Sequence, residues 1–334
     1  MKFMRKFLMA SVLCAGTALA IQPSYALTDT DVVVSIKPLH SLVSAVMKDV
    51  AEPQLIVKGA GSGHTYSLKP SDAKMLENAK LIFWTGPSME MFLSKPLETL
   101  GTKAQQIMLG EVSGLTTYGF REGGAFEGHD HGDGEHDHGN NNSSIHEHEH
   151  EHGHGHGHDH SHEHGHDAHI WLDPSNGETM VEEIANVLSE ADPANAKTYH
   201  ANADSYKERI AKLDKELKDE LAPVKAKPFV VFHDAYQYFE KRYGLNTVGS
   251  ITVSPENAPG AARIKEIHDK IVSLNAVCVF SEPQFESRLL QTVIDGTSAK
   301  TGILDPLGAE LKDGPDLYLN LLRDLAVSLN KCLN

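Results

Sequence analysis

Residues 192–223 read DPANAKTYHANADSYKERIAKLDKELKDELAP, and their apolar side chains recur at intervals of three and four. These side chains are Tyr199, Ala203, Tyr206, Ile210, Leu213, Leu217 and Leu221. This spacing puts them on one face of an α-helix. Asp192 and Pro193 favour a helix start, and Pro223 favours a stop. The stretch therefore predicts one amphipathic helix of about thirty residues, roughly 45 Å long at 1.5 Å per residue.

Short β-branched runs alternate with helix-like segments on both sides of this helix. The runs are DVVVSI, QLIVK, LIFWTG and QQIML before residue 110, and FVVFH, NTVGSIT, AVCVFSE and TGILDP after residue 228. Such alternation predicts an α/β fold in which each parallel sheet is flanked by helices. We expect two lobes, residues 27–190 and 224–334, joined by one rigid helix over 191–223. The chain has 334 residues, 40% of them hydrophobic, which is enough for two modest cores.

The first 26 residues, MKFMRKFLMASVLCAGTALAIQPSYA, have the organisation of a secretory signal peptide. Three basic residues precede an apolar run from Phe7 to about Ala20, and small residues at Ser24 and Ala26 mark a cleavage site. The apolar run is short for a membrane-spanning helix. We therefore predict a cleavable signal peptide over residues 1–26 and a periplasmic mature protein.

The charge of the chain limits its partners. With 30 basic and 46 acidic residues, the formal charge is −16. The predicted signal peptide contains three of the basic residues and no acidic one, so its removal lowers the charge from −16 to −19. Because a negative surface repels phosphate backbones, we predict no nucleic-acid partner.

Two cysteines remain after the signal peptide, Cys278 in the apolar run AVCVF and Cys332 close to the C-terminus. An exported protein meets an oxidising compartment, which favours a disulfide between them. Such a bond would fasten the C-terminal helix to a core strand and, in the chain-entropy model, stabilise the fold by roughly 4 kcal/mol. The alternative is two unrelated thiols.

Residues 127–167 have a different composition from the rest of the chain. They contain fifteen histidines, eleven acidic residues, no Lys or Arg, and Ile145 as the only aliphatic side chain. Such a segment cannot bury enough apolar surface to offset the entropy cost of ordering. We predict a disordered loop inserted in the first lobe. Its imidazoles and carboxylates are suited to weak zinc binding at many sites without a fixed geometry.

This histidine-rich tract contains the strings His146–His150 and His162–His166, which match the HExxH pattern of zinc proteases. In those enzymes the two histidines share one face of a stable helix. The tract has no apolar stripe that would support a helix. We therefore interpret these matches as products of low complexity.

Three histidines outside the tract lie close to predicted strand ends. His64 follows the second strand in GAGSGHTYSLKPSD, His169 opens HIWLDP, and His233 ends FVVFH. Ligands of parallel α/β sheets bind beyond the carboxyl ends of the strands, so these side chains can converge from both lobes. Three imidazoles suit Zn²⁺, with a carboxylate or water in the fourth position. Alternatively, each histidine is a loop residue bonded to the backbone.

Several strings of the sequence resemble one protein family. They are GSGHTYSLKPSD, LIFWTGPSMEMFL, HIWLDP, FVVFHDAYQYFEKRYGL, SEPQF and ILDPLG. In this order they resemble the cluster A-I (family 9) substrate-binding proteins of ABC transporters and, within that family, its zinc-specific ZnuA-type members. The resemblance covers nearly the whole chain after the signal peptide, and it implies two α/β lobes with the metal in the cleft between them.

The resemblance also implies a ligand set. It assigns His64, His169 and His233 as zinc ligands, and because manganese-binding relatives have a carboxylate at the place of His233, it favours zinc. Some zinc relatives have a glutamate before the first histidine, where this chain has Gly63. Asp305, in GILDPLG, is then the candidate fourth ligand. The alternatives are that water fills this position and that Asp305 caps a helix start.

The function implied is that of a periplasmic high-affinity zinc-binding protein. It would carry Zn²⁺ as cargo to a membrane permease with its ATPase, act as a monomer without catalysis, and have a periplasmic zinc chaperone as a further partner. Two alternatives are a zinc-dependent hydrolase and a zinc storage or buffering protein. The first lacks a general base in a motif beside the ligands, and the second leaves the two ordered lobes unexplained.

Overall fold

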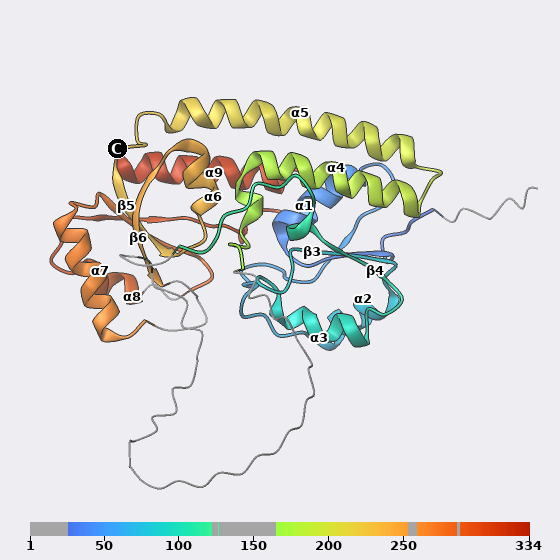
Figure 1. Cartoon of the computed structure of the whole chain (residues 1–334), viewed down its shortest axis with the longest axis horizontal. Coiled ribbons are helices and arrows are strands. Elements are labelled where there is room, and N and C mark those ends of the chain that lie inside the picture. The colour runs from blue at the N-terminus through green and yellow to red at the C-terminus, as the bar shows by residue number, and fades with distance from the viewer. Residues whose placement is uncertain (1–25, 122–125, 127–164, 253–258, 286–287) are drawn as a thin grey trace, which may run out of the picture.

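Two four-stranded parallel sheets lie side by side beneath a layer of long helices in the computed structural model of the chain (Figure 1). The structure describes residues 26–121, 126, 165–252, 259–285 and 288–334. The predicted signal peptide, except its last residue, and the histidine-rich tract up to residue 164 lie outside the described residues. The predicted α/β fold with two lobes is confirmed.

The first lobe contains strands β1 (Val32–Val34), β2 (Gln54–Leu55), β3 (Leu81–Trp84) and β4 (Gln105–Met108), all parallel, in the order β2-β1-β3-β4. Helices α1 (Lys37–Val46), α2 (Pro70–Asn78) and α3 (Met91–Thr99) connect them. Two short 3₁₀ helices, η1 (Leu109–Glu111) and η2 (Ile170–Leu172), flank the segment with the histidine-rich tract. Every residue of β1 and β3 is buried, as expected for a strand covered by helices on both faces.

The second lobe repeats this topology. Its strands β5 (Pro228–His233), β6 (Asn246–Thr252), β7 (Cys278–Ser281) and β8 (Lys300–Ile303) have the order β6-β5-β7-β8. Its helices are α6 (Gln237–Tyr243), α7 (Ala261–Ser273), α8 (Arg288–Ile294) and the C-terminal α9 (Leu317–Leu333). In both sheets the second strand lies on one side of the first strand, and the third strand lies on its other side. This change of direction creates a switch point, where ligands of α/β folds bind.

Helix α5 (Ala196–Leu221) packs beside α4 (Pro174–Ala191) and α9 in the layer above both sheets (Figure 1). Its buried residues are the seven apolar positions that the periodicity predicted. The helix is 26 residues long, about 39 Å. It begins at Ala196 rather than at Asp192, because the buried Asp192 carboxylate accepts bonds from the Leu27 backbone N–H and the Tyr199 hydroxyl.

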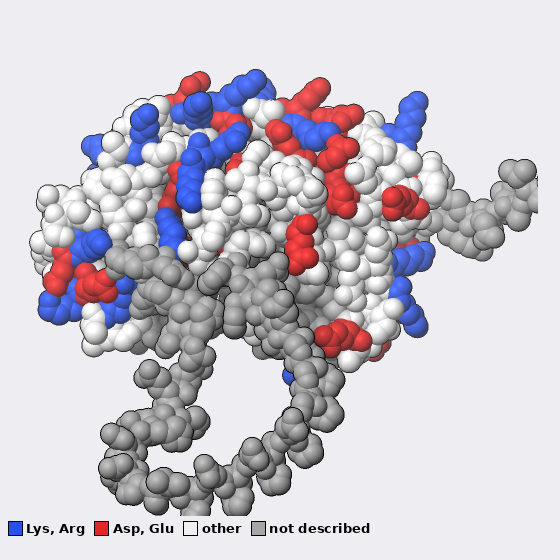
Figure 2. All heavy atoms as spheres, viewed as in Figure 1, with Lys and Arg blue, Asp and Glu red and all other residues white. Residues whose placement is uncertain are grey.

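The outer face of α5 is charged, and Figure 2 shows basic and acidic side chains interspersed along the edge where this helix runs. Lys207 pairs with Asp204, and Lys212 with Glu216, at the spacing that brings residues to one side of a helix. Among the described residues, no helix combines the length and apolar character needed to cross a bilayer.

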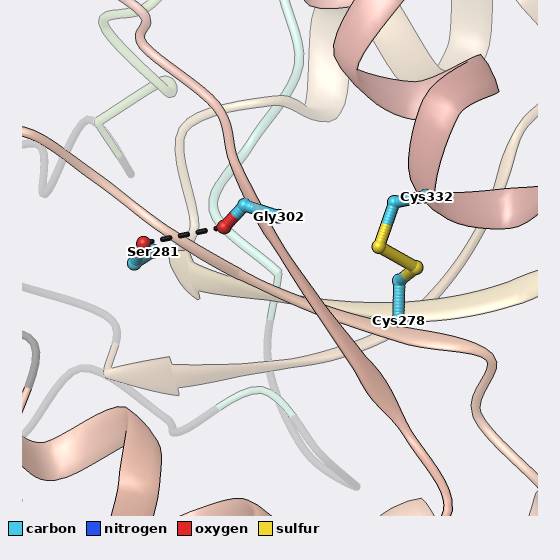
Figure 3. Close-up of a disulfide and its surroundings, with 4 residues drawn as sticks. All are labelled: Cys278, Ser281, Gly302 and Cys332. Carbon is cyan, nitrogen blue, oxygen red and sulfur yellow. Dashed lines mark hydrogen bonds between the residues drawn. A yellow bond between two sulfur atoms is a disulfide. The ribbon is translucent and has the colours of Figure 1, made fainter.

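Cys278 of β7 and Cys332 of α9 form a disulfide, as predicted, with their Cα atoms 6.1 Å apart (Figure 3). Gly302 of β8 lies beside this bond, where a Cβ atom would come within 2.5 Å of the Phe280 ring and 3.3 Å of Cys332 Sγ. A glycine at this position leaves room for the Phe280 ring and for the disulfide. The bond fastens the C-terminal helix to a central strand of the second sheet.

Candidate metal centre

The structure brings His64, His169 and His233 together between the two lobes. His64 lies in the connection from β2 to α2, His169 directly precedes η2, and His233 is the last residue of β5. His169 Nε2 is 3.3 Å from His64 Nε2 and 3.2 Å from His233 Nε2. One nitrogen from each ring lies within 4.8 Å of the others, and this is the group of potential metal ligands that the described residues form.

Carboxylates orient two of these rings through the ring nitrogen Nδ1. Asp167 Oδ1 accepts a hydrogen bond from His169 Nδ1 over 2.7 Å and one from the His169 backbone N–H over 3.0 Å. Glu282 Oε1 does the same for His233, over 2.7 Å to Nδ1 and 3.3 Å to the backbone N–H. With the proton held on Nδ1, each ring presents the lone pair of Nε2 to the centre.

Burial and mutual repulsion keep two of the imidazoles neutral. Burial lowers the pKa of His64 and of His169 well below the ordinary value of 6.5. The neighbouring rings lower both pKa values further, because a positive charge on one imidazole disfavours a charge on the next. Neutral imidazole is the form that binds a metal ion, so these two residues are prepared for coordination.

The pKa values of His233 and Asp167 are raised instead. Burial lowers the pKa of His233, but the charge of Glu282 and its hydrogen bond raise it, and the result lies above 6.5. Burial raises the pKa of Asp167 to about 6, although hydrogen bonds from His169 and Gln237 act against this. His233 is therefore the position where protons compete most strongly with a cation.

The histidines line a small pocket together with Met89, Trp171 and residues of the second lobe. Its volume of about 10 Å³ is sufficient for one water-sized particle. His169 and His233 are only 6% and 3% exposed. The arrangement can enclose a single ion, and it has no space for an extended substrate in this conformation.

Asp305 forms several hydrogen bonds with the turn that follows β8. Its Oδ1 accepts hydrogen bonds from Gln284 Nε2 and from the backbone N–H groups of Leu307 and Gly308, and its Oδ2 accepts one from Ala309. It is not a member of the histidine group. The carboxylate thus caps the turn that follows β8, and its role as fourth ligand stays a prediction.

Asp167 was missed by sequence reasoning. The tract was predicted to form a loop as far as residue 167, but Asp167 is 2% exposed and its carbonyl accepts a bond from the Tyr238 hydroxyl. Gly119 and His166 form an antiparallel bridge just outside it. Asp167 is therefore part of the folded first lobe. The signal that could have found it is the apolar run AHIWL, which starts one residue later.

His40 is a further buried histidine of the first lobe, and it is not a member of the histidine group. It lies in α1, and its Nε2 is 2.9 Å from the carbonyl oxygen of Pro53. Burial lowers the pKa of His40. It is a backbone-bonded residue of the first lobe.

Comparison with known proteins gives consistent matches over the whole chain. The family described as "ZnuA: Zinc-uptake complex component A periplasmic" matches residues 32–332. A Brucella suis biovar 1 protein named "High-affinity zinc uptake system protein ZnuA" is 62% identical over 336 residues, which cover 100% of both chains. A Paracoccus denitrificans protein of the same name is 42% identical over 323 residues, covering 96% of this chain and 97% of its own.

Solved structures share the fold. One described as "Crystal structure of 138-173 ZnuA deletion mutant plus zinc bound" superposes with a TM-score of 0.70 at 23% identity, and covers 91% of this chain and 99% of its own. At this identity the likeness concerns the architecture, two lobes with parallel sheets under a long helix.

Proposed function

The chain belongs to the ZnuA family of periplasmic zinc-uptake components, and on this premise we propose that it captures Zn²⁺ between its lobes and delivers it to an ABC importer. His64, His169 and His233 are the proposed ligands, each through Nε2. The observation that carries the proposal is the convergence of three ring nitrogens, one from each histidine, within 4.8 Å, with two of the rings fixed by a carboxylate at Nδ1.

The chemistry of the donor set fits zinc. Three imidazole nitrogens with one remaining position match the tetrahedral preference of Zn²⁺. The fourth position is best assigned to water, because the hydrogen bonds to Asp305 engage both of its oxygens with the turn after β8. A hard cation such as Mn²⁺ prefers oxygen ligands, which this set lacks.

Transport is favoured over hydrolysis by the shape of the site. A hydrolase needs room for a substrate beside the metal-bound water and a base to take its proton. The cavity measures about 10 Å³, and the two nearest carboxylates, Asp167 and Glu282, are bonded to the ligand rings. Zinc held in this way is cargo, and a family of uptake components supports the same reading.

The same proposal covers location and partners. Residues 1–26 act as a cleavable signal peptide, and the mature protein works in the periplasm as a monomer. Its partners are a membrane permease with its ATPase, and a periplasmic zinc chaperone is a further proposed source of the metal. The histidine-rich tract binds additional Zn²⁺ weakly, as its mixture of imidazoles and carboxylates suggests.

Competition titration tests the ligand assignment. The parent is expected to bind one Zn²⁺ far more tightly than the rest, and His64→Ala and His169→Ala are each expected to lose that tight site. Asp305→Asn serves as the matched variant, since it removes a charge near the centre and leaves the three imidazoles in place. A tight site that survives both histidine substitutions would contradict the assignment, and one lost in Asp305→Asn would restore Asp305 as fourth ligand.

A further inference from the structure

Arg121 joins the two lobes beside the proposed zinc centre. It lies at the end of the segment that leaves η1 of the first lobe, and its guanidinium faces Asp234 and Glu240 of the second lobe. Arg121 Nε donates to Asp234 Oδ2 over 3.0 Å, and Nη1 donates to Glu240 Oε2 over 2.6 Å. Nη2 donates to the other oxygen of both carboxylates. The guanidinium thus pairs with both carboxylates in a forked geometry.

This ion-pair cluster is largely removed from solvent. The side chains of Asp234 and Glu240 are 7% and 6% exposed, and that of Arg121 is 19% exposed. The ring of Phe126 covers the guanidinium, with its centroid 4.0 Å from Arg121 Cζ. Arg121 is therefore the hydrogen-bonded cation of two buried carboxylates from the other lobe, and its loss would be costly because a buried charge without a partner is strongly unfavourable.

The cluster acts on a metal ligand through the chain. Asp234 directly follows His233, and the Ala235 backbone N–H donates to the His233 carbonyl over 2.9 Å, which closes a tight turn. Glu240 lies on α6, the helix that this turn enters. Fixing both carboxylates therefore fixes the turn after β5 and, with it, the backbone of His233.

Neighbouring hydrogen bonds hold residues 116–121 against α6, the helix that carries Glu240. The Tyr118 backbone N–H donates to the Tyr238 hydroxyl over 3.3 Å, and Gln237 Nε2 donates to the Gly119 carbonyl over 3.1 Å. On its other side the segment is held by α4, where Thr116 and Asn176 exchange two hydrogen bonds. Residues 116–121 thus run from a helix of the first lobe to a helix of the second.

We propose that Arg121 is a latch between the lobes, a positioning residue that keeps the His233 turn closed over bound Zn²⁺ and slows its release. This inference rests on the proposed zinc-binding function. A metal ion enclosed in so small a cavity has to wait for the lobes to part, so contacts made only in the closed form set the release rate. Zinc association begins from the form in which the lobes are apart, so the association rate depends much less on Arg121.

Arg121→Lys tests the latch, because lysine keeps the charge but cannot pair with two carboxylates in a fork. The matched control is Arg242→Lys. Arg242 lies on the same α6 helix and makes a forked pair with Asp214 of α5, over 3.0 and 2.6 Å. Its ion pair with the first lobe, to Asp173, is a single longer contact of 3.8 Å. Both substitutions weaken an arginine–carboxylate pair of α6, but only the first replaces a forked pair between the lobes.

The measurement is zinc release from the full chain into excess chelator, followed by stopped-flow tryptophan fluorescence. The Trp171 ring is 5.3 Å from the His169 ring, and the histidine-rich tract contains no tryptophan, so changes in the signal report the cleft rather than the tract. The second tryptophan, Trp84, is the last residue of β3 and gives a background signal. Arg121→Lys is expected to release zinc about tenfold faster than the parent, with an association rate close to the parental one. The Co²⁺-loaded variant should keep the parental absorption spectrum, because its ligands are the same.

A third variant keeps the test decisive if Arg121→Lys does not fold. Arg121→Gln combined with Asp234→Asn and Glu240→Gln leaves no buried charge without a partner, and it should fold and release zinc faster than the parent. Release at the parental rate from whichever variant folds, or an equal acceleration in Arg242→Lys, would overturn the latch. A parent chain that binds no zinc tightly would instead contradict the proposed function itself.

Discussion

His233 and Glu282 are 49 residues apart in the sequence, yet a single oxygen of Glu282 accepts both the ring Nδ1–H and the backbone N–H of His233. The pairing of Asp167 with His169, only two residues apart, has the same form. In both cases one carboxylate fixes the rotation of the ring and its tautomer. Each lobe thus orients a histidine with a carboxylate, which is close in the sequence in the first lobe and distant in the second.

Removing the negative charge of Glu282 should weaken zinc binding without removing a ligand. Glu282→Gln keeps an oxygen for Nδ1 but makes the imidazole a poorer donor, so the affinity is expected to fall about 10- to 100-fold. Competition titration at pH 8 measures this, and Asp167→Asn provides the corresponding change behind His169. An affinity equal to that of the parent in both variants would show that the carboxylates do not tune the centre.

Zinc affinity should decrease when the pH falls from 8 towards 6. The pKa of His233 lies above 6.5, so this ring is the first of the three to gain a proton, and a protonated Nε2 cannot bind the ion. The lowered pKa values of His64 and His169 keep those rings neutral to more acidic pH. In Glu282→Gln the decrease should begin at a lower pH. Dissociation constants measured at half-unit intervals test this, and a flat profile down to pH 5.5 would contradict it.

The position of Asp167 determines where the histidine-rich tract can be cut. Deletion of residues 127–164 should leave a folded protein with one tight zinc site, because the core and the three proposed ligands remain. Deletion of residues 127–167 removes the partner of His169 Nδ1 as well and should bind zinc about 10- to 100-fold more weakly. Calorimetric titration of both chains gives stoichiometry and affinity. Equal affinities would mean that Asp167 is dispensable.

Much of the fold could be predicted because its signals are local. The eight strands of the described residues fall within or overlap the runs expected to form strands. The central strands β1 and β3 are buried throughout, and such strands need apolar side chains on both faces, whereas the edge strands β4 and β8 are mostly exposed. The buried face of α5 followed from intervals of three and four. The start of α5 could not be predicted, because Asp192 bonds to Leu27, which lies 165 residues away.

The centre was predictable only in part, for a related reason. His64, His169 and His233 could be singled out because parallel sheets bring strand ends to one edge. Arg121 carries no local signal, since its partners Asp234 and Glu240 follow 113 and 119 residues later. Pairs of that kind become visible when the chain is folded.

The disulfide should support stability more than zinc binding. Cys278 and Cys332 are 54 residues apart in the sequence, and reduction of the bond that closes this loop is expected to cost roughly 4 kcal/mol in the chain-entropy model. The melting temperature should fall on reduction, with zinc affinity nearly unchanged. Thiol labelling of the oxidised native protein is the control, and two freely labelled cysteines there would refute the bond.

The choice of metal should depend on His233. A third imidazole favours Zn²⁺, whereas Mn²⁺ prefers oxygen ligands. His233→Glu is therefore expected to weaken zinc and narrow its advantage over manganese. His233→Ala leaves two imidazoles, and should weaken zinc more than Glu282→Gln does, because it removes a ligand rather than the partner of one. Both substitutions are best made in the chain that lacks residues 127–164, since the weak sites expected in the tract would hide the change. Competition titrations in which His233→Ala holds zinc as tightly as this shortened parent would exclude His233 as a ligand and, with it, a centre built from both lobes.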